Sequence, residues 1–105
     1  MVMPKKRRVS SLDSFKIFET DQFLDDLTQD FSGQQERIKS KLHADVYPRL
    51  KQQPYFGKHI KKLKGYTPPT WRYRIGDYRF FYTMDDDQKI VFMIAIDHRG
   101  SSYQG

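Results

Sequence analysis

Four arginines stand where a phosphate-binding surface would need them. Arg72 and Arg74 alternate with apolar and aromatic residues in the β-prone run 71–75, Arg79 follows a tight turn, and Arg99 comes after the last β-prone run. A guanidinium stays charged at physiological pH and donates two parallel N–H bonds to a phosphate. Held near a phosphorus under attack, it stabilises the negative charge of the transition state. These residues therefore indicate phosphate binding, or else an ordinary solvated hairpin face.

Three β-prone runs carry these residues. Residues 71–75 and 78–84 flank Gly76-Asp77, a two-residue connection that suits a tight hairpin because glycine tolerates positive φ. Residues 89–97 form a third, strongly apolar run. We expect three consecutive strands at these positions.

Alternation along these strands decides where the arginines point. Successive side chains face opposite sides of a sheet, so Arg72, Arg74 and Arg79 are predicted to share one face. In the last strand the even positions from 90 to 96 are predicted to share one face, and Arg99 is in phase with the other. All four guanidiniums are thus expected to converge.

Two helices are predicted from apolar residues at helical spacing. Thr20 has the properties of an N-cap, and the helix that follows it is expected to bury Phe23, Leu24, Leu27 and Phe31. A second helix over 34–53 has an apolar stripe at every fourth position, formed by Ile38, Leu42, Val46 and Leu50. Pro48 lies inside it and predicts a kink or a helix end near Tyr47.

The order of the predicted elements defines the fold class. A first strand over 15–19 precedes the helices, and a loop over 55–70 with a short extended piece near 60–63 follows them. The expected order is β-α-α-β-β-β, an α+β fold in which a two-helix hairpin packs on a small antiparallel sheet. One face of that sheet would lie under the helices, and the other would be free for function.

Length and composition fit one small domain. The 105 residues suit a single core over 14–105, and residues 1–13, with four cations at 5–8, are expected to form a flexible basic tail. The chain has no cysteine, which suits a reducing cytoplasm, and no apolar run approaches the roughly 20 residues that span a bilayer. We therefore expect a cytoplasmic protein without a membrane segment.

Charge and histidines narrow the chemistry further. Between residues 58 and 79 there are seven basic residues and one acid, Asp77, a field that attracts a phosphate-rich ligand. The spacing of His43, His59 and His98 does not predict a metal site. His98 is the candidate acid or base because histidine ordinarily titrates near neutrality, although its phase with Ile96 would instead turn it towards the core.

Four motifs follow one another in a characteristic order. They are Lys-Leu-Lys-Gly at 62–65, Gly-Asp-Tyr-Arg at 76–79, Asp-His-Arg at 97–99 and Tyr103. With the order of elements, they resemble the RelE/ParE superfamily of bacterial and archaeal toxins over roughly residues 15 to 103. The resemblance implies a RelE-like fold. Members similar to RelE are ribonucleases that cut messenger RNA in the ribosomal A site with basic side chains and without a metal or other cofactor.

The resemblance also implies roles for individual residues. The family's two strand bases match Arg72 and Arg74, and its hairpin arginine matches Arg79. Its arginine after the last strand matches Arg99, and its C-terminal tyrosine matches Tyr103. Both strand bases are Arg here where RelE is Lys-rich, and Arg is far harder to deprotonate, so a conventional general base suits these positions less well.

In the implied reaction the ribose 2′-OH attacks the adjacent phosphate. Arg79 and Arg99 would hold the phosphate, Arg72 or Arg74 would lower the pKa of the 2′-OH, and Arg99 or His98 would assist the departing 5′-oxygen. The residues expected to bind RNA by charge or by stacking on bases are Lys61, Lys62, Lys64, Phe81 and Tyr103.

Three functions compete at this point. The leading hypothesis is the toxin of a type II toxin–antitoxin system that acts as a ribosome-dependent, metal-independent endoribonuclease and inhibits translation. A ParE-like inhibitor of DNA gyrase and a non-toxic interaction module of the same fold are the alternatives. Either toxin implies a cognate antitoxin and a hetero-oligomer with it, and the ribonuclease would act on messenger RNA on the 70S ribosome.

Overall fold

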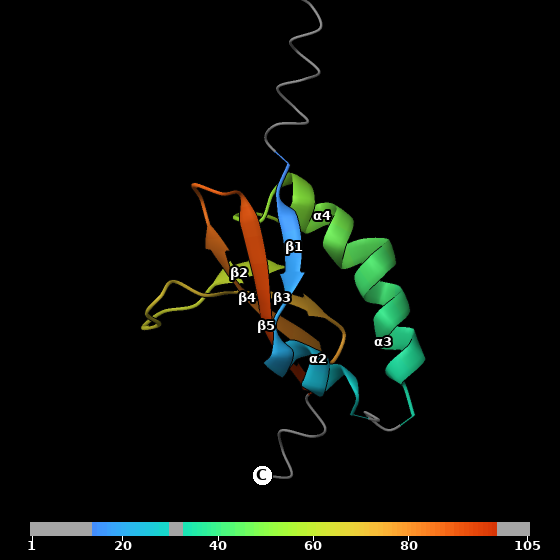
Figure 1. The fold of residues 1–105 in the computed structure, drawn as a ribbon. Helices are drawn as coiled ribbons and strands as arrows, with labels where there is room; N and C mark the ends of the chain where they lie inside the picture. Colours follow the sequence, from blue (N-terminus) through green and yellow to red (C-terminus); the bar gives the residue numbers. More distant parts are fainter. Residues whose placement is uncertain (1–13, 30–32, 99–105) are drawn as a thin grey trace, which may run out of the picture.

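The computed structural model describes residues 14–29 and 33–98, which form one layer of helices and one sheet (Figure 1). The helical elements are α2 (Asp21–Leu27), α3 (Gln35–Lys41), the π-helical turn η1 (Leu42–Val46) and α4 (Tyr47–Gln52). The strands are β1 (Lys16–Glu19), β2 (Ile60–Lys62), β3 (Trp71–Ile75), β4 (Tyr78–Asp85) and β5 (Ile90–His98). The predicted tail, residues 1–13, lies outside the described residues.

The sheet confirms the α+β class and differs from the expectation in one respect. Its order is β1-β5-β4-β3-β2, with β2 to β5 antiparallel to their neighbours. β1 pairs with β5 in parallel, so the sheet is mixed and has five strands. Thr20 fixes this junction because its backbone N–H and its hydroxyl both donate to the Met93 carbonyl, at 3.1 and 2.8 Å. Alternation predicts which face a residue occupies, and it does not predict which strands are neighbours.

Helix α2 begins as predicted. The Thr20 hydroxyl oxygen accepts a hydrogen bond from the Phe23 backbone N–H at 3.3 Å, which satisfies one of the free donors of the first turn. Phe23 and Leu27 are buried, but Leu24 is 44% exposed, so its predicted place in the core is wrong. Phe31, predicted on the same face, lies outside the described residues.

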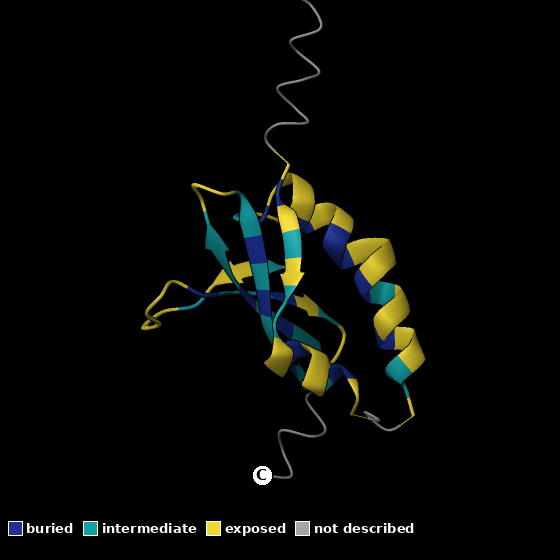
Figure 2. Ribbon diagram, viewed as in Figure 1, coloured by how far each residue is buried: buried dark blue, intermediate teal, exposed yellow. Residues whose placement is uncertain are grey.

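The second helical segment keeps its predicted stripe and passes Pro48 without ending there. Ile38, Leu42, Val46 and Leu50 are all fully buried, while the positions turned away from the sheet are exposed (Figure 2). Proline lacks an N–H and its ring clashes with the carbonyl four residues earlier. The chain accommodates it with the π-helical turn, in which the Tyr47 N–H bonds to the Leu42 carbonyl, and helix continues to Gln52.

The core lies between this stripe and one face of the sheet, which we call the covered face. The strands contribute Tyr73, Phe80, Tyr82, Val91, Met93 and Ile96 to it. Two buried tyrosines tie the layers together by hydrogen bonds. Tyr82 donates to the Pro54 carbonyl at 2.8 Å, and Tyr47 donates to the Glu19 carboxylate at 2.6 Å.

A β-bulge in β5 changes the predicted phase of that strand. Phe81 lies opposite Ala95, but the next residue of β4, Tyr82, lies opposite Met93, so Ile94 is the extra residue. Before the bulge the odd positions Val91 and Met93 face the core, and after it Ile96 does. The prediction of one continuous face for the even positions from 90 to 96 is therefore wrong.

We predict that the stripe carries much of the stability. Leu50→Ala should lower the free energy of unfolding by about 2–5 kcal/mol, because it truncates a fully buried side chain and leaves a cavity in its place. Leu24→Ala removes the same atoms from a half-exposed site and should cost less than about 1 kcal/mol. Urea denaturation measures both. Equal losses in the two variants would contradict the packing described above.

Tyr47 gives a second prediction, on alkaline stability. Burial raises the pKa of its phenol, and the hydrogen bond from Tyr47 to Glu19 raises it further. Because the unfolded chain releases this proton near pH 10 and the folded chain retains it, stability present below that pH is lost as the pH rises above it. In Tyr47→Phe the decline in the free energy of unfolding between pH 9 and 11 should be shallower by up to about 1.4 kcal/mol per pH unit. Identical pH profiles for the two proteins would disprove this coupling.

Candidate nucleic-acid interface

Two rows of side chains cross the face of the sheet that is opposite the core, which we call the open face. In the first row Lys61 lies opposite Arg72, and Arg72 lies opposite Phe81. In the second row Arg74 lies opposite Arg79, which in turn lies opposite Asp97. Side chains paired in this way have Cβ atoms about 4.5–5.5 Å apart. The open face is thus defined by Lys61, Arg72, Arg74, Arg79, Phe81, Ala95 and Asp97.

The arginines of the open face agree with the alternation predicted for β3 and β4. Tyr73 and Phe80 between them are buried, because they pack in the same cluster as the helical stripe. Arg72 and Arg79 are half-buried, and Arg74 is exposed. In the described part of the chain, both helical segments send their buried residues to the covered face. The open face therefore keeps its cations at the surface.

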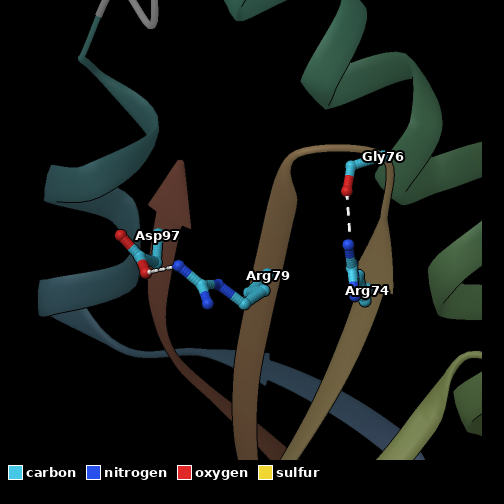
Figure 3. Close-up of polar contacts among 4 residues, drawn as sticks. All are labelled: Arg74, Gly76, Arg79 and Asp97. Carbon is cyan, nitrogen blue, oxygen red and sulfur yellow. Dashed lines mark hydrogen bonds and ion pairs between the residues drawn. The ribbon is translucent and has the colours of Figure 1, made fainter. Parts of the chain in front are cut away.

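The two paired arginines point apart (Figure 3). Arg79 extends towards β5, where its Nη2 donates to the Asp97 Oδ2 at 2.5 Å. Arg74 points along β3 towards the β3–β4 turn, where its Nε donates to the Gly76 carbonyl at 3.4 Å. Like charges placed opposite one another destabilise a sheet, and this divergence reduces that repulsion. Among the described carboxylates, none forms an ion pair with Arg72 or Arg74.

His98 does not join the arginines. It lies opposite Tyr78, and the two rings stack with centroids 4.6 Å apart. Tyr78 donates to the Gln34 side chain at 3.0 Å, at the start of α3, so this pair lies on the covered face. Of the two readings that the sequence left open, the phase with Ile96 is the one the structure adopts. The expected role of His98 at a departing oxygen is therefore not supported by its position.

The three lysines predicted to bind RNA separate as well. Lys61 is on the open face, opposite Arg72. Lys62 points the other way, with its Nζ 5.4 Å from the centre of the Trp71 ring. Lys64 is exposed in the loop between β2 and β3, outside the strand pairing. Only Lys61 shares a row with an arginine, because adjacent strand residues cannot face the same side.

The predicted site includes two further residues. Arg99 and Tyr103, the arginine after the last strand and the C-terminal tyrosine, lie outside the described residues. Their roles, and those of the other site residues, remain predictions. The structure places Arg72, Arg74 and Arg79 on one face with Phe81 beside them, and the convergence of all four guanidiniums stays a prediction.

A pocket on the other side of the sheet was not predicted from the sequence. This pocket of about 570 Å³ lies between the second helical segment, α3 to α4, and β3. Its lining includes Lys41, Asp45, Arg49, His59 and Tyr73. Burial raises the pKa of the Tyr73 phenol, and the nearby Arg49 offsets part of this rise. The sequence carried one signal for this pocket. Lys41 and Arg49 directly precede the stripe residues Leu42 and Leu50, so they lie at the edge of the contact between helix and sheet.

Two features are absent from the described part of the chain. Residues 14–29 and 33–98 contain no group of three or more His, Asp or Glu side chains placed to hold a metal ion. None of the helices in the same part of the chain is both long enough and apolar enough to cross a membrane.

Comparisons with solved structures identify relatives of the fold. The chain is similar to the toxin–antitoxin complex RelBE2 from Mycobacterium tuberculosis, with a TM-score of 0.66 and 24% identity over 82% of this chain and 92% of that one. It is similar to the intact E. coli RelBE toxin–antitoxin complex, with a TM-score of 0.59 and 21% identity over 81% and 96%. A YoeB/ParE toxin from Agrobacterium tumefaciens gives a TM-score of 0.59 and 22% identity over 80% and 98%. These likenesses show the fold.

The family itself is shown by the sequence. No curated protein matches this chain. Residues 19–103, which include every element of the sheet from β2 to β5 and both helical segments, match the profile of the ParE toxin of the type II toxin–antitoxin system parDE. The chain therefore belongs to the ParE toxin family, within the RelE/ParE superfamily of type II toxin–antitoxin systems.

Proposed function

We propose that this toxin is an endoribonuclease that cleaves messenger RNA in the ribosomal A site and so inhibits translation. One observation carries the proposal. Lys61, Arg72, Arg74 and Arg79 come from three adjacent strands and share one face of the sheet, with Phe81 beside them. Cations interleaved with an aromatic ring on a sheet are typical of surfaces that bind single-stranded RNA, where the ring stacks on bases and the cations contact phosphates.

The reaction follows from the charge of this surface. The ribose 2′-oxygen attacks the adjacent phosphorus, the bond to the 5′-oxygen breaks, and the proton lost from the 2′-OH is balanced by one gained at the 5′-oxygen. Negative charge increases on the phosphoryl oxygens as the pentacoordinate state forms. Arg72 and Arg74, which no described carboxylate neutralises, are the groups suited to stabilise it. By the family resemblance, Arg99 and Tyr103 would complete the site.

The proposed partner is a cognate antitoxin, and two of the similar structures are toxin–antitoxin complexes. A chain that covers the open face would meet three arginines and a lysine, which favours an acidic segment there. Such a cover would exclude RNA from the same surface. A complex in which the antitoxin leaves both the open face and the helices exposed would count against this part of the proposal.

Inhibition of DNA gyrase is the second candidate. The matching family profile is that of the ParE toxin, which favours it. The described open face has no histidine to act as acid or base, because His98 lies on the covered face. A gyrase inhibitor acts by binding, so it needs no such group.

We predict that expression of the protein arrests translation and leaves new 5′ ends inside coding regions. With purified ribosomes, Arg72→Ala should lower the rate of cleavage by roughly 10²-fold, the usual loss for one preorganised donor to a transition-state oxyanion. Lys62→Ala removes the same charge from the covered side and serves as the control. Intact messages together with blocked supercoiling by purified gyrase would establish the second candidate instead. If expression is harmless and RNA stays intact, a non-toxic interaction module is the remaining hypothesis.

The neighbouring lysines supply a matched test of the surface. Lys61→Ala should weaken binding of a single-stranded RNA oligonucleotide and lower the slope of log K against log salt concentration by about 0.7, the value for one lost phosphate contact. Lys62→Ala should leave both quantities unchanged, because its side chain lies against Trp71 on the other side. Fluorescence anisotropy at several salt concentrations measures them. A larger effect at Lys62 than at Lys61 would place the RNA elsewhere.

A further inference from the structure

Asp97 is an acid on the face proposed to bind RNA. It lies opposite Arg79 in the β4–β5 pairing, and its Oδ2 accepts from the Arg79 Nη2 at 2.5 Å. Both side chains are about one-third exposed, at 36% for Arg79 and 31% for Asp97. The contact therefore sits at the surface, where a ligand has access to it.

The bulge in β5 is what places Asp97 there. Val91 and Met93 face the core, so an uninterrupted strand would turn Asp97 to the core as well. The extra residue at Ile94 reverses the phase, and Asp97 reaches the open face while Ile96 takes its place below. Arg74, directly opposite Arg79 on its other side, adds a repulsion that favours the turn of Arg79 towards β5.

The guanidinium nitrogen that Asp97 accepts from, Nη2 of Arg79, matters for phosphate binding. A guanidinium binds a phosphate in bidentate fashion either side-on, through Nε and Nη2, or end-on, through Nη1 and Nη2. Nη2 takes part in both arrangements, so a carboxylate on Nη2 leaves at most one of them to a phosphate. The carboxylate also offsets most of the charge that Arg79 presents to an approaching anion.

We infer that Asp97 is an internal competitor for Arg79 that lowers the affinity of the open face for RNA phosphate. The inference rests on the proposed function only in taking the open face as the RNA-binding surface. A phosphate that binds Arg79 has to displace the Asp97 carboxylate or share the guanidinium with it. Asp97 thus sets how many cations of this face contact RNA, and Arg72 and Arg74 make the contacts that need no displacement.

The test is binding of a single-stranded RNA oligonucleotide to wild-type protein and to Asp97→Asn, by fluorescence anisotropy over a range of salt concentrations. Asparagine keeps the shape and removes the charge. Binding should be about two- to fivefold tighter, the range that corresponds to one exposed ion pair. The slope of log K against log salt should steepen by about 0.7, because one more cation contacts phosphate.

Asp77→Asn is the matched control, since it makes the same change of charge in the β3–β4 turn, where Asp77 is exposed and takes no part in the Arg79 pair. It should change affinity and slope by less than half as much. In an Arg79→Ala background, Asp97→Asn should have no effect on either quantity. The double variant also distinguishes an effect that acts through Arg79 from a general loss of structure. Urea denaturation of each protein monitors such a loss.

Three results would overturn the inference. They are equal effects of Asp97→Asn and Asp77→Asn, an unchanged or weaker affinity in a folded Asp97→Asn protein, and no binding of the oligonucleotide by any variant. Tighter binding by Asp97→Asn in a protein that does not cleave messages on the ribosome would support the inference and refute the proposed function alone.

Discussion

One-sided burial of the sheet is the constraint on which the rest of the structure depends. The stripe of Ile38, Leu42, Val46 and Leu50 covers one face, and the described chain offers no second helical layer for the other. Every second residue of β3 and β4 is therefore committed to the core, and the residues between them must tolerate water. Arginine at 72, 74 and 79 meets that requirement, since its stem packs on the sheet while its guanidinium stays hydrated. A charged open face follows directly from how the core is built.

The bulge at Ile94 adds the second determinant. By reversing the phase of β5, it sends Ile96 and His98 to the covered face and Asp97 to the open one. One extra residue thus removes a titratable ring from the arginines and supplies a carboxylate to one of them. The open face has an uneven charge as a result. Its β3 arginines lack a described counter-ion, and its β4 arginine has one at 2.5 Å.

Much of this fold was predictable from the sequence, and the failures have physical causes. Alternation and helical spacing are local, so the strand bounds near 71–75 and the stripe from Ile38 to Leu50 followed from them. The parallel pairing of β1 with β5 and the bulge at Ile94 depend on which strands are neighbours, and no local pattern encodes that. The exposure of Leu24 shows the same limit, because its helical phase alone does not say how wide the buried face is. The partnership of Asp97 with Arg79 was missed because it depends on the register of β4 against β5, which pairs these two residues directly.

The central claim is that RNA binds the open face, and nuclear magnetic resonance tests it most directly. Isotope-labelled protein is titrated with a single-stranded RNA oligonucleotide, and the shifts of assigned backbone amides and arginine Nε–H groups are followed. The account predicts the largest changes at Lys61, Arg72, Arg74 and Phe81. Changes centred instead on the pocket that Arg49 and His59 line, between the helical segment and β3, would contradict it.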